Sequence, residues 1–110
     1  MEITKQTIND VTAIAPEGQI DGKTGPLLQA AIKEEIKPDG KILLDFAKVT
    51  FMSSAGLRVL LVVHRQAKAQ NLKIVLANLS PALMNIMAVT GFLPYFTICS
   101  TVDEGVKRLA

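Results

Sequence analysis

The sequence predicts a single α/β domain over residues 1–110, with a mixed, mostly parallel sheet of about five strands and about four helices packed against it. Two short, almost continuous apolar runs, at 41–46 and 72–77, are typical of buried parallel strands. A helical pattern at 54–70 lies between them, as a right-handed crossover requires. An alternating pattern at the amino end adds an antiparallel hairpin, which makes the sheet mixed. A chain of 110 residues suits one domain.

The amino-terminal part predicts two strands and then a helix. EITKQTI at 2–8 alternates polar and apolar residues, and DVTAIAPEG at 10–18 resumes the alternation after the turn signal at Asn9. The pattern becomes helical from Thr24, and the Pro-Asp-Gly sequence at 38–40 stops it. The element order therefore starts β-β-α.

The remaining elements alternate strand and helix. Ser80 is a good helix cap, Pro81 suits the first helical position, and Gly91 suits the end of that helix. FTICS at 96–100 predicts the last strand. The Thr-x-x-Glu spacing that starts at Thr101 is a capping box and predicts a terminal helix. The full expected order is β-β-α-β-α-β-α-β-α.

Composition excludes several classes of function. Hydrophobic residues make up 49% of the chain and charged residues 20%, which is typical of a globular domain. The net charge of +2 comes with scattered lysines, so we expect no direct nucleic-acid binding. The longest apolar run, 59–63, is too short for membrane insertion, and no signal peptide is apparent, so we expect a cytoplasmic protein. The single cysteine, Cys99, excludes an internal disulfide and predicts a buried thiol at a strand end.

Motifs for catalysis, metals and cofactors are missing. No glycine-rich loop with nucleotide-binding spacing follows a strand. The single histidine, His64, lies within a predicted helix, as a surface or boundary residue would. Asp21 and Asp45 stand near strand ends, where a catalytic carboxylate pair is conceivable. The simpler interpretation is that Asp21 fixes a loop and Asp45 caps or terminates a strand. We expect no enzyme activity, no metal and no cofactor.

Two adjacent serines open the long helix in the stretch FMSSAGLRVLL at 51–61. A cap needs one hydroxyl, which leaves the other at a helix N-terminus, where negative charge is favourable. At about 100° per residue, one side of the helix faces the sheet: Gly56, Val59, Leu60, Val63 and Ala67. The opposite side carries Ser54, Leu57, Arg58, Leu61, Arg65 and Lys68.

The outward leucines, Leu57 and Leu61, allow two interpretations. With Arg58 and Arg65 they form a small contact patch, or neighbouring loops and the third helix cover them. A phosphate on Ser54 would meet the helix N-terminus, with Arg58 one turn further on, so the fold should survive it. A partner lying on the patch would instead meet a dianion. The simpler alternative makes both serines ordinary residues of a helix start.

The stretch ILLDFAKVTFMSSAGLRVLL at 42–61 resembles the signature region of STAS domains, especially bacterial anti-sigma factor antagonists. In that family an apolar strand ends in Asp, and Asp-Ser-Ser/Thr-Gly-Leu opens an apolar helix. Asp45, Ser54, Gly56 and Leu57 match this pattern. Three further stretches resemble the loop beside the phosphoserine, a later loop and a helix end: Gly18-Gln19-Ile20-Asp21, Asn78-Leu79-Ser80-Pro81 and Thr90-Gly91-Phe92. The resemblance covers nearly the whole chain, in the same order.

This resemblance implies a regulator of sigma-factor-dependent transcription that has no catalysis of its own. In the family, the unphosphorylated protein binds an anti-sigma factor that is also a serine kinase, and this frees the sigma factor. Phosphorylation of the serine separates the two proteins, and a phosphatase resets the switch. The family pattern and the outward side of the helix together predict the partner-binding residues Asp21, Ser53, Ser54, Gly56, Leu57, Arg58, Leu61 and Arg65. A monomer or weak dimer is expected.

The sequence departs from the family pattern beside the phosphorylated serine. Ser53 stands where the family has an acidic residue, and Ala55 follows Ser54 in place of Ser or Thr. Ser54 is the expected phosphorylation site, and Ser53 is the alternative. A different class of function also stays open, that of a constitutive STAS scaffold in a lipid-transport or signalling complex, with no phospho-switch. A sensor of a small ligand or nucleotide, using the Asp21 loop, is a third possibility.

Overall fold

The computed structural model describes all residues from 1 to 110 and has six strands and four α-helices. The fold class expected from the sequence is confirmed. In chain order the elements are β1 (Glu2–Ile8), β2 (Val11–Ile20), α1 (Gly25–Lys33), β3 (Lys41–Asp45), β4 (Val49–Met52), α2 (Ser54–Ala69), β5 (Lys73–Ala77), α3 (Pro81–Val89), the 3₁₀ helix η1 (Leu93–Tyr95), β6 (Thr97–Cys99) and α4 (Val102–Leu109).

The sheet has the order β1-β2-β3-β5-β6, with β1 antiparallel to β2 and the other pairs parallel. The sequence did not predict the short strand β4, which pairs with the last part of β2. The register of that pairing shifts at Gly18, whose φ of +96° favours glycine. β2 therefore contacts β3 with its first half and β4 with its second half. β4 has only four residues, and its two middle residues are exposed, so its local pattern is too weak to predict a strand.

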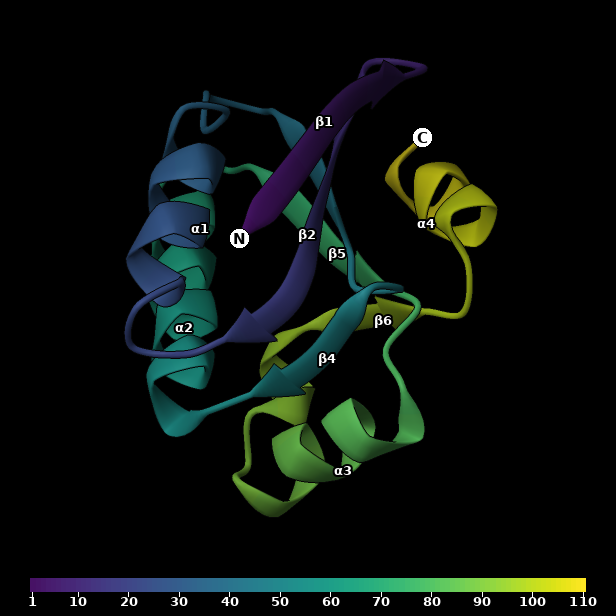
Figure 1. The fold of residues 1–110 in the computed structure, drawn as a ribbon. Coiled ribbons are helices and arrows are strands. Elements are labelled where there is room, and N and C mark those ends of the chain that lie inside the picture. Colours follow the sequence, from purple (N-terminus) through teal and green to yellow (C-terminus); the bar gives the residue numbers. More distant parts are fainter.

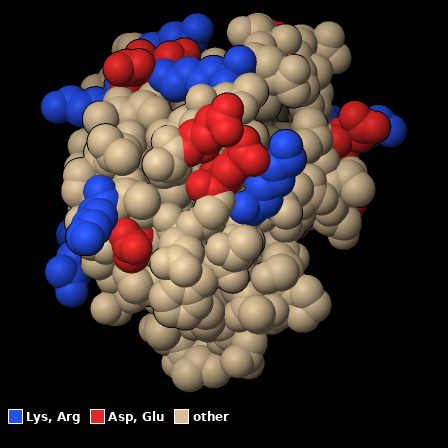
Figure 2. Space-filling model, viewed as in Figure 1, with Lys and Arg blue, Asp and Glu red and all other residues tan.

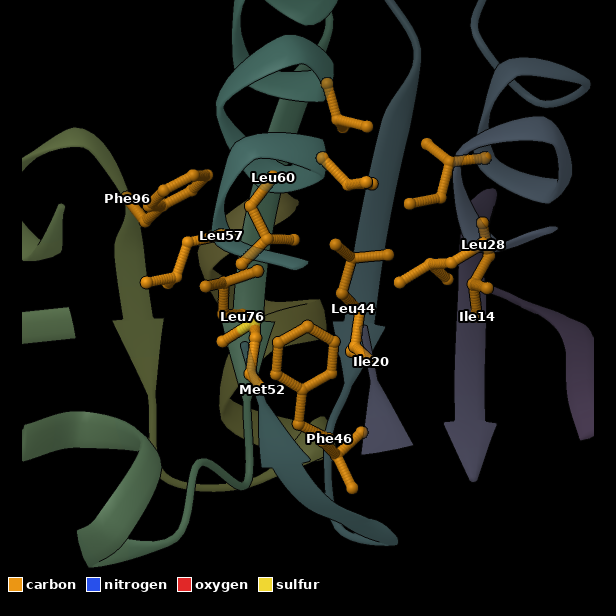
Figure 3. Packing of buried hydrophobic residues seen from close by; sticks show 14 of the residues in the cluster. Ile14, Ile20, Leu28, Leu44, Phe46, Met52, Leu57, Leu60, Leu76 and Phe96 are labelled. Atoms are coloured by element: carbon orange, nitrogen blue, oxygen red, sulfur yellow. The ribbon is translucent and has the colours of Figure 1, made fainter. Parts of the chain in front are cut away.

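Helices cover both faces of the sheet, as Figure 1 shows, with α1 and α2 on one face and α4 on the other. Two cores result. The larger one holds Ile14, Leu44 and Leu76, and the smaller one, beneath α4, holds Leu43 and Val75. Neighbouring residues of one strand thus point into different cores, which explains the nearly continuous apolar runs. Figure 3 shows the larger core between α2, α1 and the strands.

The predicted helix caps and the predicted buried thiol are confirmed. The Ser80 hydroxyl accepts a hydrogen bond from the Leu83 N–H at 3.2 Å, and the Thr101 hydroxyl accepts one from the Glu104 N–H at 3.1 Å. Cys99 is buried in the smaller core, and burial raises the pKa of its thiol. This makes the thiol a packing group. None of the helices combines the length and the apolarity that crossing a membrane would take.

Candidate functional site

The two segments that the sequence analysis singled out meet at one end of the sheet. β2 and β4 run parallel and end together, with Ile20 opposite Met52. The Ser53 N–H donates a hydrogen bond to the Ile20 carbonyl at 2.9 Å. The loop that starts at Asp21 therefore lies beside the start of α2. The short strand β4, absent from the predicted element order, creates this junction.

Ser53 and Ser54 have different roles at the start of α2. Ser53 is the N-cap, with extended backbone angles, and its hydroxyl accepts a hydrogen bond from the Gly56 N–H at 3.3 Å. Ser54 is the first helical residue and is exposed. One serine therefore satisfies the helix N-terminus, and the hydroxyl of the other faces solvent. Of the two, Ser54 is the one that a modifying enzyme can reach without breaking the cap.

Replacing Ser53 with alanine should lower the stability of the domain by about 1 kcal/mol, because the Gly56 N–H loses its acceptor. Ser54→Ala is the matched control, since it removes the same group from an exposed position one residue away. It should change the free energy of unfolding by less than about 0.5 kcal/mol. Urea unfolding followed by circular dichroism measures both. Equal losses in the two variants would show that Ser53 is not the dominant cap.

The Asp21 carboxylate fixes its own loop. Its Oδ1 accepts hydrogen bonds from the Lys23 N–H at 2.9 Å and the Thr24 N–H at 3.0 Å. These two bonds hold the pKa of Asp21 below its usual range, and the bond from the Thr24 N–H has the larger effect. The Thr24 hydroxyl completes the loop by donating to the Gln19 carbonyl at 2.6 Å and accepting from the Asp21 N–H at 2.9 Å. The role of Thr24 was missed, although an Asp followed three residues later by Thr is a recognisable turn signal.

Asp45 also fixes a local structure, which supports the simpler interpretation of the two aspartates. Its Oδ1 accepts hydrogen bonds from the Ala47 N–H and from the Asn78 amide, both at 3.0 Å. These bonds tie the end of β3 to the segment after β5. The hydrogen bonds of Asp21 and of Asp45 go to separate partners, and each carboxylate holds the backbone of its own region in place.

Gly56 lies where α2 comes closest to the sheet. A Cβ at this position would stand 2.6 Å from the Ile20 carbonyl oxygen and 2.8 Å from Cγ of Met52. The predicted sheet-facing side of α2 is confirmed, because Gly56 and its four companions are buried. The family pattern implied that Gly56 takes part in partner binding. Since it is buried, its contribution is to set the position of the helix start.

The expectation that Leu57 faces outward is wrong. Leu57 is only 3% exposed and belongs to the larger core together with Phe96. The segment that ends in η1 and Phe96 packs along this flank of α2, and Figure 3 shows both side chains in the same part of the core. Of the residues proposed as a patch, Leu61 is half-buried, while Arg58 and Arg65 are exposed. The alternative that neighbouring segments cover the leucines is therefore correct for Leu57.

An uncharged surface, formed by α3 and by Phe51 of β4, lies next to the start of α2. Residues 74–102 contain no Asp, Glu, Lys or Arg, and they include α3 and η1. Figure 2 shows the region of α3 and the end of β4 free of charged side chains. Phe51 of β4 is 48% exposed and Val89 of α3 is 78% exposed. This surface was missed in the sequence analysis, although the long uncharged segment was a visible signal. Uncharged surfaces of this kind are typical of protein–protein contacts.

A family model described as "STAS domain" matches residues 2–105 of the chain. The chain is similar to BtrV of Bordetella bronchiseptica, designated an anti-sigma factor antagonist, with 26% identity over 102 residues that cover 92% of this chain and 88% of BtrV. The Anti-sigma-B factor antagonist of Listeria monocytogenes is 28% identical over 88 residues, which cover 79% of this chain and 77% of that protein.

Solved structures of low identity share the fold. The Thermotoga maritima protein TM1081, named for the anti-sigma factor antagonists, matches with a TM-score of 0.88 and 16% identity, over 97% of this chain and 93% of the other. The phosphorylated form of SpoIIAA, a cell fate determinant of Bacillus, matches with a TM-score of 0.72 and 20% identity, over 99% of this chain and 100% of the other. The expected resemblance is thus confirmed over nearly the full length of the sequence.

Proposed function

Because the chain belongs to the STAS domain family, whose model matches residues 2–105, we propose that it is an anti-sigma factor antagonist switched by phosphorylation of Ser54. Unphosphorylated, it binds an anti-sigma factor that is also a serine kinase, and the sigma factor is released. Phosphorylated, it leaves the kinase, and a phosphatase restores it. The protein is a ligand and a substrate in this cycle and performs no catalysis itself.

This proposal is supported mainly by the different structural roles of the two serines. Ser53 caps α2, and Ser54 is exposed at the first helical position. A phosphate on Ser54 would lie at the positive end of a 16-residue helix. Arg58 is exposed one turn further along. The modification therefore suits the folded domain and can alter binding without unfolding it. SpoIIAA has been solved in a phosphorylated form, which supports the same use of this fold.

The uncharged surface explains how one charge could release a partner. A protein docked on Phe51 and α3 would exclude water from the region beside Ser54. Placing a dianion at the rim of such a contact would strip part of its hydration and give it no counter-charge on a mainly apolar partner. The switch would then work through desolvation of the phosphate. No movement of the domain is needed.

The departure at Ser53 leaves the cap intact and removes a charge. Asp and Ser are both good N-cap residues, so Ser53 can perform the structural task of the family's acidic residue. The carboxylate would also have repelled a phosphate on the next residue. With serine in its place, we expect the phosphorylated form to be held more firmly by the helix start.

The test is a pull-down from the source organism's lysate with wild type, Ser54→Asp and Ser54→Asn as parallel baits. Asn matches Asp in size and tolerates a helix start, so it isolates the effect of the charge. Wild type and Ser54→Asn should retain a kinase-like regulator, and Ser54→Asp should bind it at least about tenfold more weakly, a loss of about 1.4 kcal/mol. Ser54→Ala should bind but escape phosphorylation by the recovered kinase.

Two outcomes would contradict the proposal. Equal recovery of the same partners by the Asp and Asn variants would make the surface a permanent docking face, as in a constitutive STAS scaffold of a lipid-transport or signalling complex. Phosphate located on Ser53 by fragmentation mass spectrometry, after incubation with the recovered kinase, would move the site by one residue. It would also mean that the kinase breaks the cap of α2.

A further inference from the structure

A cleft of about 460 Å³ lies at the far end of α2 from Ser54, and the proposed switch does not use it. It forms because the edge strand β6 has three residues and pairs only with Val75–Ala77 of β5. The first residues of β5, Lys73 and Ile74, extend beyond the start of β6 and line the opening. The last turns of α2 and of α4 form its walls. This volume is in the range of small-molecule sites.

The cleft is positively charged. Lys68 of α2, Lys73 of β5 and Arg108 of α4 line it, and no Asp or Glu does. The ion pairs of this structure use Lys5, Lys41 and Lys48, so the three cations of the cleft have no carboxylate partner. The like charges that line the cleft from three elements repel one another and raise the positive potential there. A bound anion would remove this repulsion.

The remaining lining suits the organic part of a ligand. The rings of His64 and Tyr95 meet edge to face, with centroids 5.7 Å apart, and both border the cleft. Tyr95 is 53% exposed, so much of its ring remains open to contact by a ligand. Thr97 contributes a hydroxyl, and apolar side chains such as that of Leu72 complete the lining. Half of the twelve lining residues are hydrophobic, so the cleft offers apolar surface beside its cations, as ligand sites usually do.

We propose that this cleft binds a small organic phosphate. The phosphate lies between Arg108, whose guanidinium can bind two of its oxygens, and the two lysines. The organic group lies against the rings of Tyr95 and His64. A phosphate dianion matches a site with three cations better than a carboxylate monoanion does. Ser54 is ten or more residues away along α2, or about 15 Å at 1.5 Å per residue, so the ligand and the phosphorylated serine can be present together.

The proposal is tested by titrating phenyl phosphate into ¹⁵N-labelled full chain, at constant ionic strength, and following amide shifts by NMR. Saturable shifts are expected at 73–75, 95–97 and 108–109, with a dissociation constant of about 1 mM or below. Benzoate, which has the same ring and a single charge, and inorganic phosphate, which has no ring, should each bind at least about fivefold more weakly.

Charge variants show whether the cleft itself is responsible. Arg108→Gln and Lys73→Gln should each weaken phenyl phosphate binding at least about fivefold. Lys107→Gln is the matched control, because this lysine is exposed on the same turn of α4 and does not line the cleft. It should change the affinity less than about twofold. Absence of saturation by about 10 mM, equal binding of benzoate, equal loss in the Lys107→Gln control, or shifts centred on Ser54 would each overturn the proposal.

Discussion

Gly56→Ala is expected to destabilise the domain by about 2 kcal/mol and to lower its melting temperature by about 10 °C. In an exposed helix this change would stabilise by about 1 kcal/mol, because alanine is the better helix former. Here the new methyl group would stand 2.6 Å from the Ile20 carbonyl oxygen. A backbone oxygen cannot rotate away as a side chain can, so α2 must move off the sheet. Thermal and urea unfolding measure the loss.

The same change should also weaken partner binding. The Ile20 carbonyl that the methyl group displaces accepts the hydrogen bond from the Ser53 N–H. A shift there moves the cap and carries Ser54 with it. Gly22→Ala is the control, because a Cβ on Gly22 meets nothing within 4 Å. It should leave stability within about 0.5 kcal/mol. If Gly56→Ala proves as stable as wild type, the close approach of α2 to β2 is not a constraint on the fold.

Leu57→Ala is expected to cost about 3 kcal/mol of stability, because it empties part of the larger core. Leu61→Ala, one turn later and half-buried, should cost about 1 kcal/mol or less. The pair separates a core role from a contact role. If Leu57 were a partner contact, its removal would weaken binding and leave the free energy of unfolding unchanged. Urea unfolding of both variants, with binding to the recovered kinase measured below the unfolding range, decides between the two.

These predictions share one physical arrangement. Two contacts fix the start of α2. Gly56 packs closely against Ile20 of β2, and the Ser53 hydroxyl caps the helix. Ser54 is the first residue of this fixed helix start and is exposed. In the proposed switch, this support lets the domain accept a phosphate on Ser54 without rearranging, and the charge then acts on the partner.

Local sequence determined much of this protein. The sequence predicts the helix caps at Ser80 and Thr101 and the apolar stripe of α2 without tertiary information. Each of these features depends only on residues a few positions apart. The place of Gly56 in that stripe predicted that it faces the sheet, and the structure shows the close approach there. The family signature around Ser54 then indicated the fold, because a motif of this length joins a strand, a turn and a helix, and it predicted Ser54 as the phosphorylation site.

Only the tertiary structure decided the rest. The helical period placed Leu57 with Ser54, yet the segment ending at Phe96 packs over it, and no local pattern of α2 reports what a distant segment covers. Strand β4 depends on its pairing with the last part of β2, where the register shifts at Gly18. The cationic cleft arises from a strand that ends early and from side chains of α2, β5 and α4 that converge. Each depends on contacts between residues far apart in the chain, which the period of a single element does not contain.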